Sequence, residues 1–490
     1  METVVQIGSI HERGSETVAD PRLAEAYRSS TVRLYTHRLQ ALTEVPGFER
    51  LRETARAVKR HTIENLDFYL AQFANNVERH GAHVHWASSA EEVCRIAVEV
   101  VKKSAAREVV KAKSMVGEEV ELNHAIEAAG VRPVETDLGE FIIQLAGERP
   151  AHIVAPAIHK TREDVSKLFA DHLKSERTTV PEELTAIARR ALREMFQKAG
   201  VGVSGANFAV AETGSVVTIE NEGNIRMCTT VPRVHIALIG IEKLVPRLAD
   251  LAVFLRLLGR SGTGQKLTTY TSVLTGPRRP GEDGPEEMHV IMVDNGRVKA
   301  LADPKMREML YCIRCGACLN TCPVYRKIGG HAYGGVYSGP IGALVTPEYI
   351  GLSAARELPF ASSLCGACRD VCPVKINIPD LLLHLRHEAQ TQAPQPGAGA
   401  LPEPLMFRLW AWAMRHPALY THGSTLARWG QRLVARAGWI RKIPFYPASQ
   451  WTAGRDFPAL APTSFHERWK QMQRSQKGKG QSERVKSKER

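Results

Sequence analysis

Seven of the nine cysteines lie in two short runs. The first is Cys312-x2-Cys315-x2-Cys318-x3-Cys322-Pro323, and the second is Cys365-x2-Cys368-x3-Cys372-Pro373. Thiolates in the order C-x2-C-x2-C-x3-C-P are the ligands of the two clusters in bacterial ferredoxins. The spacing therefore predicts a protein that holds iron–sulfur clusters and transfers electrons.

In such a pair of runs, three cysteines of one run surround one cluster, and the fourth reaches the other cluster. We therefore predict that cluster 1 is held by Cys312, Cys315, Cys318 and Cys372, and cluster 2 by Cys322, Cys365 and Cys368. Gly316 and Gly366 each follow a predicted ligand. A chain folded tightly around a cluster often needs the positive φ that glycine adopts readily.

The second run lacks its first cysteine, because Ser362 stands at that position. Three interpretations remain open. Cluster 2 could be a [4Fe–4S] cluster with a non-cysteine fourth ligand such as Ser362, a [3Fe–4S] cluster, or a cluster with an open iron corner that meets a substrate or partner. We favour two [4Fe–4S] clusters, the second with three cysteine ligands.

Structural zinc and disulfide bonds fit the pattern poorly. Zinc sites typically use two C-x2-C pairs or include histidines. Seven is an odd number of cysteines, and no secretory signal accompanies them. Outside the runs, we predict that Cys94 is a buried, inert thiol in a helix, whereas Cys228 could face a pocket.

The composition of the 490-residue chain, with 43% hydrophobic residues, suits two or three domains. The N-terminus has no apolar segment typical of a secretory signal. The sequence also contains no run of about 18 apolar residues, the length needed to span a membrane. We therefore expect a cytoplasmic protein, where oxygen-sensitive clusters are also most easily assembled.

The net charge of +13 is concentrated toward the C-terminus, where residues 470–490 hold eight Lys or Arg against two Glu. One interpretation is a solvated, disordered tail. Another is peripheral contact with anionic lipid at the inner face of the membrane, or with an acidic partner. Nucleic acid is not an expected partner, because no recognition motif accompanies the charge.

Changes in pattern divide the chain into six segments. They are a helical N-terminal extension (1–61), an α/β domain (62–296), an iron–sulfur domain (297–390), a Pro/Gly/Ala-rich linker (391–404), a C-terminal module (405–469) and a basic tail (470–490). The C-terminal module holds six of the seven tryptophans among many arginines. Such a composition suits a partner interface, or a small domain packed around large side chains.

Strands and helices alternate within 62–296. The strands are expected at 83–86, 108–112, 132–135, 151–155, 216–219, 235–240 and 289–293. Alternation at these lengths predicts a three-layer domain with a mostly parallel sheet. The intervening segment from Gly202 to Gly214 has neither the Rossmann nor the P-loop order. It suggests a loop that approaches a ligand closely, with Glu212 as an exposed carboxylate or a surface residue of a turn. We assign no catalytic residue.

Three blocks of sequence occur here in combination. They are LNHAIE (122–127) with VETDLGE (134–140), GANFAVAETG (205–214), and the cysteine runs with the shortened SSLCGAC version (362–368). From about residue 20 to 470, the chain resembles the lactate utilization protein B family, iron–sulfur proteins of bacterial lactate oxidation. The second block resembles the signature of the lactate-utilization (LUD) domain. The cysteine runs alone are common to ferredoxin-like modules.

The resemblance implies a LUD α/β domain with the fold of sugar-phosphate isomerases and coenzyme A transferases. An α-helical ferredoxin-like two-cluster domain and a small C-terminal helical module would follow. It also implies two companion subunits, one cysteine-rich like heterodisulfide reductase subunits and one a single LUD domain. Together the three would oxidise L-lactate to pyruvate, with this chain as the electron carrier. In the family's pattern, position 362 also lacks the cysteine.

Three functions remain in competition. The first is an electron-transfer subunit in L-lactate oxidation. The second is an enzyme whose LUD domain acts on an organic acid or acyl donor with a cluster-assisted site. The third is a redox sensor or scaffold, although the sequence offers no DNA-binding motif for a sensor.

Overall fold

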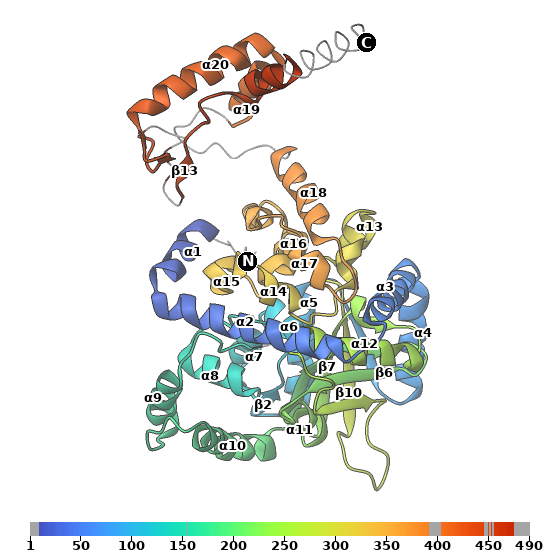
Figure 1. Cartoon of the computed structure of the whole chain (residues 1–490). Helices are drawn as coiled ribbons and strands as arrows, with labels where there is room; N and C mark the ends of the chain where they lie inside the picture. The colour runs from blue at the N-terminus through green and yellow to red at the C-terminus, as the bar shows by residue number, and fades with distance from the viewer. Residues whose placement is uncertain are drawn as a thin grey trace. The chain divides into compact units, whose positions relative to one another are not determined.

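A six-stranded, wholly parallel sheet forms the centre of the α/β domain (Figure 1). In spatial order its strands are β1 (His83–Ala87), β10 (Glu287–Val293), β7 (Val234–Gly240), β4 (Val201–Gly205), β2 (Glu108–Lys111) and β3 (Arg132–Glu135). The predicted parallel sheet is therefore confirmed. The chain passes from β2 outward to β3 and then returns to the other side of β2 as β4, so the order switches between β2 and β4.

The computed structural model describes residues 9–153, 155–391, 403–444, 449, 452 and 455–474. The chain divides into two units, Met1–Ala393 and Pro394–Arg490. This division lies within the stretch predicted as a linker, most of which (392–402) is outside the described residues. The other domain boundaries suggested by the sequence remain predictions.

Both faces of the sheet are buried. Along β7, Val234 and Ile236 enter the core on one face, whereas Ala237 and Ile239 enter the core on the other. Because a parallel sheet is covered on both sides, its strands are apolar almost throughout. The helices of this domain are α4 (Leu66–Arg79), α5 (Ala90–Lys103), α6 (Met115–Glu119), α7 (Leu122–Ala128), α8 (Leu138–Ala146), α9 (Arg162–Leu173), α10 (Pro181–Lys198), α11 (Asn224–Thr230) and α12 (Leu248–Gly262).

Side-chain caps fix where several helices begin. The Ser89 hydroxyl accepts the Glu92 amide at 3.3 Å at the start of α5, and the Ser114 hydroxyl accepts the Gly117 amide at 3.0 Å at the start of α6. The segment that begins at this cap is not one continuous helix. Instead the chain breaks at Glu121, whose φ of 54° is left-handed, and α7 starts afresh.

A second, four-stranded sheet has the order β8 (Leu244–Val245), β5 (Phe208–Val210), β6 (Ser215–Glu220) and β9 (Tyr270–Leu274). Strands β5, β8 and β9 were not predicted. The strand predicted at 151–155 is wrong for its described residues, which form no strand. There the Ala151 amide donates to the Pro156 carbonyl at 3.0 Å and closes a turn, while the Tyr325 hydroxyl donates to the Ala151 carbonyl at 2.9 Å.

Gly202 lies in the middle of β4, not in a loop near a ligand as predicted. A Cβ added at Gly202 would lie 1.8 Å from the Cys228 carbonyl oxygen of α11. The glycine therefore allows a helix to approach the sheet closely. Cys228 is buried, and burial raises the pKa of its thiol to about 12, so it is an inert thiol.

The iron–sulfur domain is helical and packs against the first helices of the chain. Helices α1 and α2 lie against α15, and α2 also contacts α14 (Figure 1). The bounds of the N-terminal helices are α1 (Ile10–Ala19), α2 (Pro21–Thr43) and α3 (Phe48–Glu64). Those of the iron–sulfur domain are α13 (Arg297–Ala302), α14 (Ala317–Thr321), α15 (Tyr325–Ile328), α16 (Gly339–Ile350), α17 (Ala367–Val371) and α18 (Ile378–Thr391).

The second unit contains α19 (Glu403–Arg415) and α20 (Pro417–Gly430), followed by a small sheet of β11 (Ala435–Arg436), β12 (Trp439–Ile440) and β13 (Phe457–Pro458). Its tryptophans Trp410, Trp412, Trp429, Trp439 and Trp469 are exposed. Trp451 and most of the basic tail, 475–490, lie outside the described residues. Within the described ranges, no helix combines the length and apolarity needed to cross a membrane.

The packing of α11 on β4 leads to a test. We expect Gly202→Ala to lower the free energy of unfolding by about 3 kcal/mol, because a methyl group forced against the Cys228 carbonyl must displace the helix. Urea unfolding followed by circular dichroism measures this. Gly423→Ala is the control, because a Cβ there meets nothing within 4 Å. Equal stability of both variants and the wild type would contradict the packing.

Candidate iron–sulfur site

The two cysteine runs fold into loops with the same backbone, shifted by 50 positions (312 to 362). Arg314 and Leu364 have φ of 58° and 54°, and Gly316 and Gly366 have φ of 76° and 86°. The positive φ expected at both glycines is thus present. A short helix follows each loop, α14 after the first and α17 after the second.

Ser362 occupies the position of Cys312 in this repeat. The Arg314 amide donates to Cys312 Sγ at 3.4 Å, and the Leu364 amide donates to Ser362 Oγ at 3.1 Å. The serine hydroxyl therefore has the same local partner as the first thiol of the complete run. This geometry places an oxygen where the incomplete run lacks a sulfur.

The seven thiols gather into two neighbouring groups. Burial raises the pKa of Cys315 to about 12, with further contributions from Cys372 and Cys312. Burial also raises the pKa of Cys368 to about 12, with contributions from Cys322 and Cys365. Burial also raises the pKa of Cys318, and the proximity of both Cys315 and Cys368 raises it further. Which cluster each thiolate binds remains a prediction.

The chemistry of these thiols fits bound iron. All seven are free of disulfides, and most are buried. Burial and the proximity of other thiolates make ionisation unfavourable, so a thiolate set here needs positive charge from a metal. Amides are directed at the sulfurs: the Tyr325 amide lies 3.5 Å from Cys322 Sγ, and the Ile376 amide lies 3.4 Å from Cys372 Sγ. Such N–H···S contacts favour the charged ligand and tune a cluster's potential.

Among the described residues, the cysteine sulfurs form no compact group of the kind that a single zinc ion needs. Four sulfurs at tetrahedral Zn–S distances would be about 3.8 Å from one another. Among the residues that the structure describes, no three of these sulfurs all lie within 4.8 Å of each other.

Two arginines of the N-terminal helices donate hydrogen bonds to backbone carbonyls of the second cysteine run. Arg52 of α3 donates to the Cys372 carbonyl through Nε at 3.0 Å and Nη2 at 2.8 Å. Arg38 of α2 donates to the Val371 carbonyl at 3.2 Å. Both side chains are buried. The N-terminal extension thus covers the Cys372 side of the site, whereas Cys365 is exposed.

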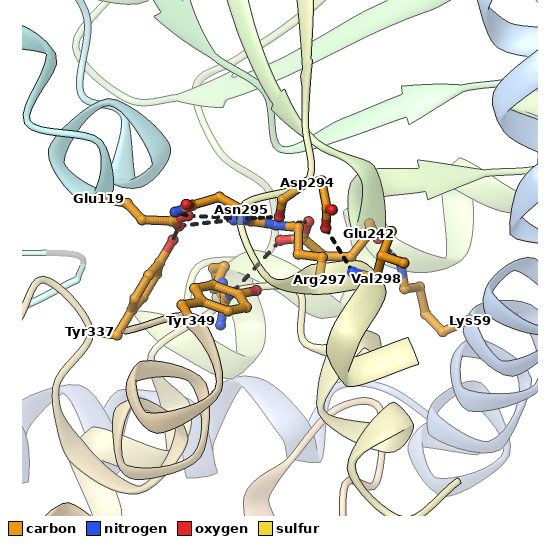
Figure 2. A network of polar contacts seen from close by, with 10 residues as sticks. Lys59, Glu119, Glu242, Asp294, Asn295, Arg297, Val298, Tyr337 and Tyr349 are labelled. Atoms are coloured by element: carbon orange, nitrogen blue, oxygen red, sulfur yellow. Dashed lines mark hydrogen bonds and ion pairs between the residues drawn. The ribbon is translucent and has the colours of Figure 1, made fainter. Parts of the chain in front are cut away.

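A buried charge network joins the α/β domain to the first cysteine loop (Figure 2). Arg297, whose side chain is 0% exposed, donates to both oxygens of Glu119 at 2.9 Å and to Glu242 Oε2 at 2.6 Å. The Tyr337 hydroxyl donates to Glu119 Oε2 at 2.6 Å. Arg314, from the cysteine loop, approaches Glu242 Oε1 at 3.6 Å.

The network favours the charged forms of its side chains. Burial alone would raise the pKa of Glu242, but Arg297, Lys243 and Arg314 together lower it to about 2. Arg314 also lies 4.5 Å over the Tyr337 ring, and Arg297 lies 4.5 Å over the Tyr349 ring. The network therefore fixes the guanidinium of Arg314 beside the first cysteines.

A cavity of about 270 Å³ lies between the sheet and the first cysteine loop. Its wall includes Ser114 after β2, Gly205 at the end of β4, and both Arg314 and Cys315. Ligands of open α/β sheets bind outside the carboxyl ends of the strands, where the strand order switches. This cavity has that position, between β2 and β4.

Other residues singled out from the sequence have structural roles. Glu212 accepts the Leu248 amide at 3.0 Å at the start of α12, so it is a capping group. Cys94 is half-buried, and burial raises the pKa of its thiol to about 11. No local pattern distinguishes Arg297 or Glu242, because both lie in ordinary polar contexts and are neighbours only in the fold.

The charge network can be tested by removing one partner. We expect Arg297→Met to destabilise the protein by about 3 to 5 kcal/mol, because two buried carboxylates lose their counter-charge. Chemical unfolding measures the loss. Arg278→Met is the control, since its partner Glu286 is about half exposed and such pairs contribute at most about 1 kcal/mol. Similar losses in the two variants would argue against the network's importance.

Comparisons with known proteins agree with this architecture. Family models match the LUD domain at residues 70–293, the 4Fe-4S dicluster domain at 308–376, and the C-terminal region of lactate utilisation protein B at 384–474. The dicluster match indicates two iron–sulfur clusters. A crystal structure of a DUF162 family protein from Deinococcus radiodurans covers 46% of this chain and 98% of its own, at 14% identity. Its TM-score of 0.26 is too low to support an argument.

Curated relatives align along almost the whole chain. Lactate utilization protein B from Bacillus cereus (strain AH820) and that from Bacillus thuringiensis (strain Al Hakam) are each 43% identical over 461 residues. Each alignment covers 94% of this chain and 96% of the relative. This similarity runs through the LUD domain, both cysteine loops and the C-terminal module, and the chain therefore belongs to the lactate utilization protein B family.

Proposed function

We propose that this protein is the iron–sulfur electron carrier in the oxidation of L-lactate to pyruvate. The observation that carries the proposal is the gathering of seven thiols from two repeated loops, in a chain of the lactate utilization protein B family. When bound, such clusters accept and release electrons one at a time, which suits a relay from a two-electron oxidation. The protein's residues position, bury and tune the relay.

In this proposal, Cys312, Cys315, Cys318 and Cys372 hold cluster 1, and Cys322, Cys365 and Cys368 hold cluster 2. Both clusters are [4Fe–4S], and cluster 2 has three cysteine ligands. Ser362 Oγ is the candidate for the remaining corner, supported by its place in the repeated loop. A [3Fe–4S] cluster at the second site is the alternative.

The exposure of the cysteines suggests which cluster exchanges electrons with a partner protein. The Cys365 side of the site is open to solvent, whereas α2 and α3 cover the Cys372 side. Cluster 2 is therefore the proposed exchange point with a partner protein. Arg369 and Asp370, both exposed beside Cys368, are proposed to tune it.

The proposed partners are a cysteine-rich subunit like those of heterodisulfide reductases and a subunit with a single LUD domain. The exposed tryptophans of the C-terminal module support docking to a protein, because aromatic side chains are enriched at interfaces. The proposed location is the cytoplasm, with peripheral contact of the basic C-terminus with the inner face of the membrane.

Iron analysis and low-temperature EPR on anaerobically purified protein test the relay. We expect about eight irons per chain, the content of two cubane clusters. EPR signals should appear only after reduction and be broadened by coupling between two close clusters. A strong signal in the oxidised sample would instead indicate a [3Fe–4S] cluster at the Ser362 site. Protein without iron would overturn the proposal.

Single substitutions test the ligand assignment. If the fourth cysteine of each run crosses over, Cys322→Ala should disturb the same reduced EPR signal as Cys368→Ala, and Cys372→Ala the same signal as Cys312→Ala. Cys94→Ala is the control and should leave both signals intact. Loss of one common signal in Cys322→Ala and Cys312→Ala would show instead that each run binds its own cluster.

A further inference from the structure

The cavity between the sheet and the first cysteine loop contains two cationic side chains that each have a buried nitrogen without a hydrogen-bond partner. Among the residues that the structure describes, the buried Nζ of Lys113 and the buried Nη1 of Arg314 have no hydrogen-bond partner. Lys243 is 8% exposed and lies close enough to Glu242 to help lower the pKa of that carboxyl. All three side chains line the cavity. Buried nitrogens without an acceptor are unfavourable, so this arrangement favours an anionic oxygen between Lys113 Nζ and Arg314 Nη1.

The acidic groups of the same wall are already used by the backbone. Glu222 accepts the Leu138 amide at 3.0 Å, and Asp137 accepts the Glu140 amide at 3.1 Å. Glu220 accepts the amides of Ile225 and Arg226 at 2.8 and 2.7 Å. These three carboxylates therefore have partners of their own, and Lys113 Nζ and Arg314 Nη1 stay available to a ligand.

The balance of charge limits what the cavity can take. Its charged lining consists of three cationic and three acidic side chains, namely Lys113, Lys243, Arg314, Asp137, Glu220 and Glu222. A single negative charge can be matched by Lys113 Nζ and the unpartnered Nη1 of Arg314, whereas a dianion would add repulsion from the carboxylates. Neutral groups at Asn207 and Thr263 can bind an oxygen next to the charge. The volume of about 270 Å³ suits a small molecule.

We propose that this cavity binds a small organic monocarboxylate, of the size of a 2-hydroxy or 2-oxo acid, directly beside Cys315. Lys113 and Lys243 bind the carboxylate, and Arg314 places the ligand against the first cysteine loop. The site lies next to the complete cysteine run, not at the Ser362 corner of the incomplete one. The α/β domain is then a ligand-binding domain whose occupancy can affect cluster 1.

Isothermal titration calorimetry on the anaerobically purified full chain tests the binding. The probes are L-lactate, pyruvate and inorganic phosphate, each titrated separately. We expect saturable binding of at least one carboxylate, with phosphate at least tenfold weaker. The absence of heat with both carboxylates, or phosphate binding as tight as theirs, would overturn the proposal.

Substitution of the cations locates the site. Lys113→Met should weaken carboxylate binding at least tenfold, and Lys243→Gln provides a second variant in case the first does not fold. Lys167→Met, on the exposed side of α9, is the matched control and should bind as the wild type does. Wild-type affinity in a folded Lys113→Met or Lys243→Gln protein would place the ligand elsewhere and reject the site.

A spectroscopic readout separates this proposal from the relay on which it partly rests. The ligand should shift the g-values of one reduced EPR signal in the wild type, and the shift should disappear in Lys113→Met. Two intact clusters with no carboxylate binding would reject the ligand site alone. Carboxylate binding by a protein without clusters would reject the relay alone.

Discussion

The buried side chain of Arg297 is the contact on which the arrangement of the functional parts depends. It follows the last strand of the parallel sheet and binds Glu119 and Glu242, which follow β2 and β7. Glu242 in turn faces Arg314 of the first cysteine loop. Charges buried this deeply are tolerated only when each has a partner in good geometry. The sheet edge and the iron–sulfur domain must therefore dock in one relative position.

This docking gives the sheet and the cysteine loop a common wall. The carboxyl ends of parallel strands form the usual ligand site of such folds. Here that site ends at Arg314 and Cys315 instead of opening fully to solvent. The proposed ligand and the proposed cluster 1 would then be separated by little more than one loop. A binding event and a change in redox state can influence each other at such proximity.

The two cysteine loops share a backbone but differ in their surroundings. The first lies against the α/β domain through Arg314, and Arg38 and Arg52 of the N-terminal helices cover the Cys372 end of the second. The second exposes Cys365. One loop geometry, used twice, thus provides a sheltered cluster site and an accessible one. Because solvent exposure and hydrogen bonds to sulfur shift the potential of a cluster, the two sites are expected to differ in potential.

The sequence by itself determined the parts that depend on local spacing. The loop of Cys312 to Cys322 has the spacing of a cluster-binding run. Most strands of the parallel sheet, such as β7 and β10, could be placed from their local pattern, whereas the sequence predicted a loop at β4. The strand predicted at 151–155 was wrong because an apolar run also occurs in buried turns. In this turn the Tyr325 hydroxyl donates a hydrogen bond to the Ala151 carbonyl. Only the tertiary structure brought together Lys113, Lys243 and Arg314, since burial and loss of partners arise when distant segments pack and no local pattern records them.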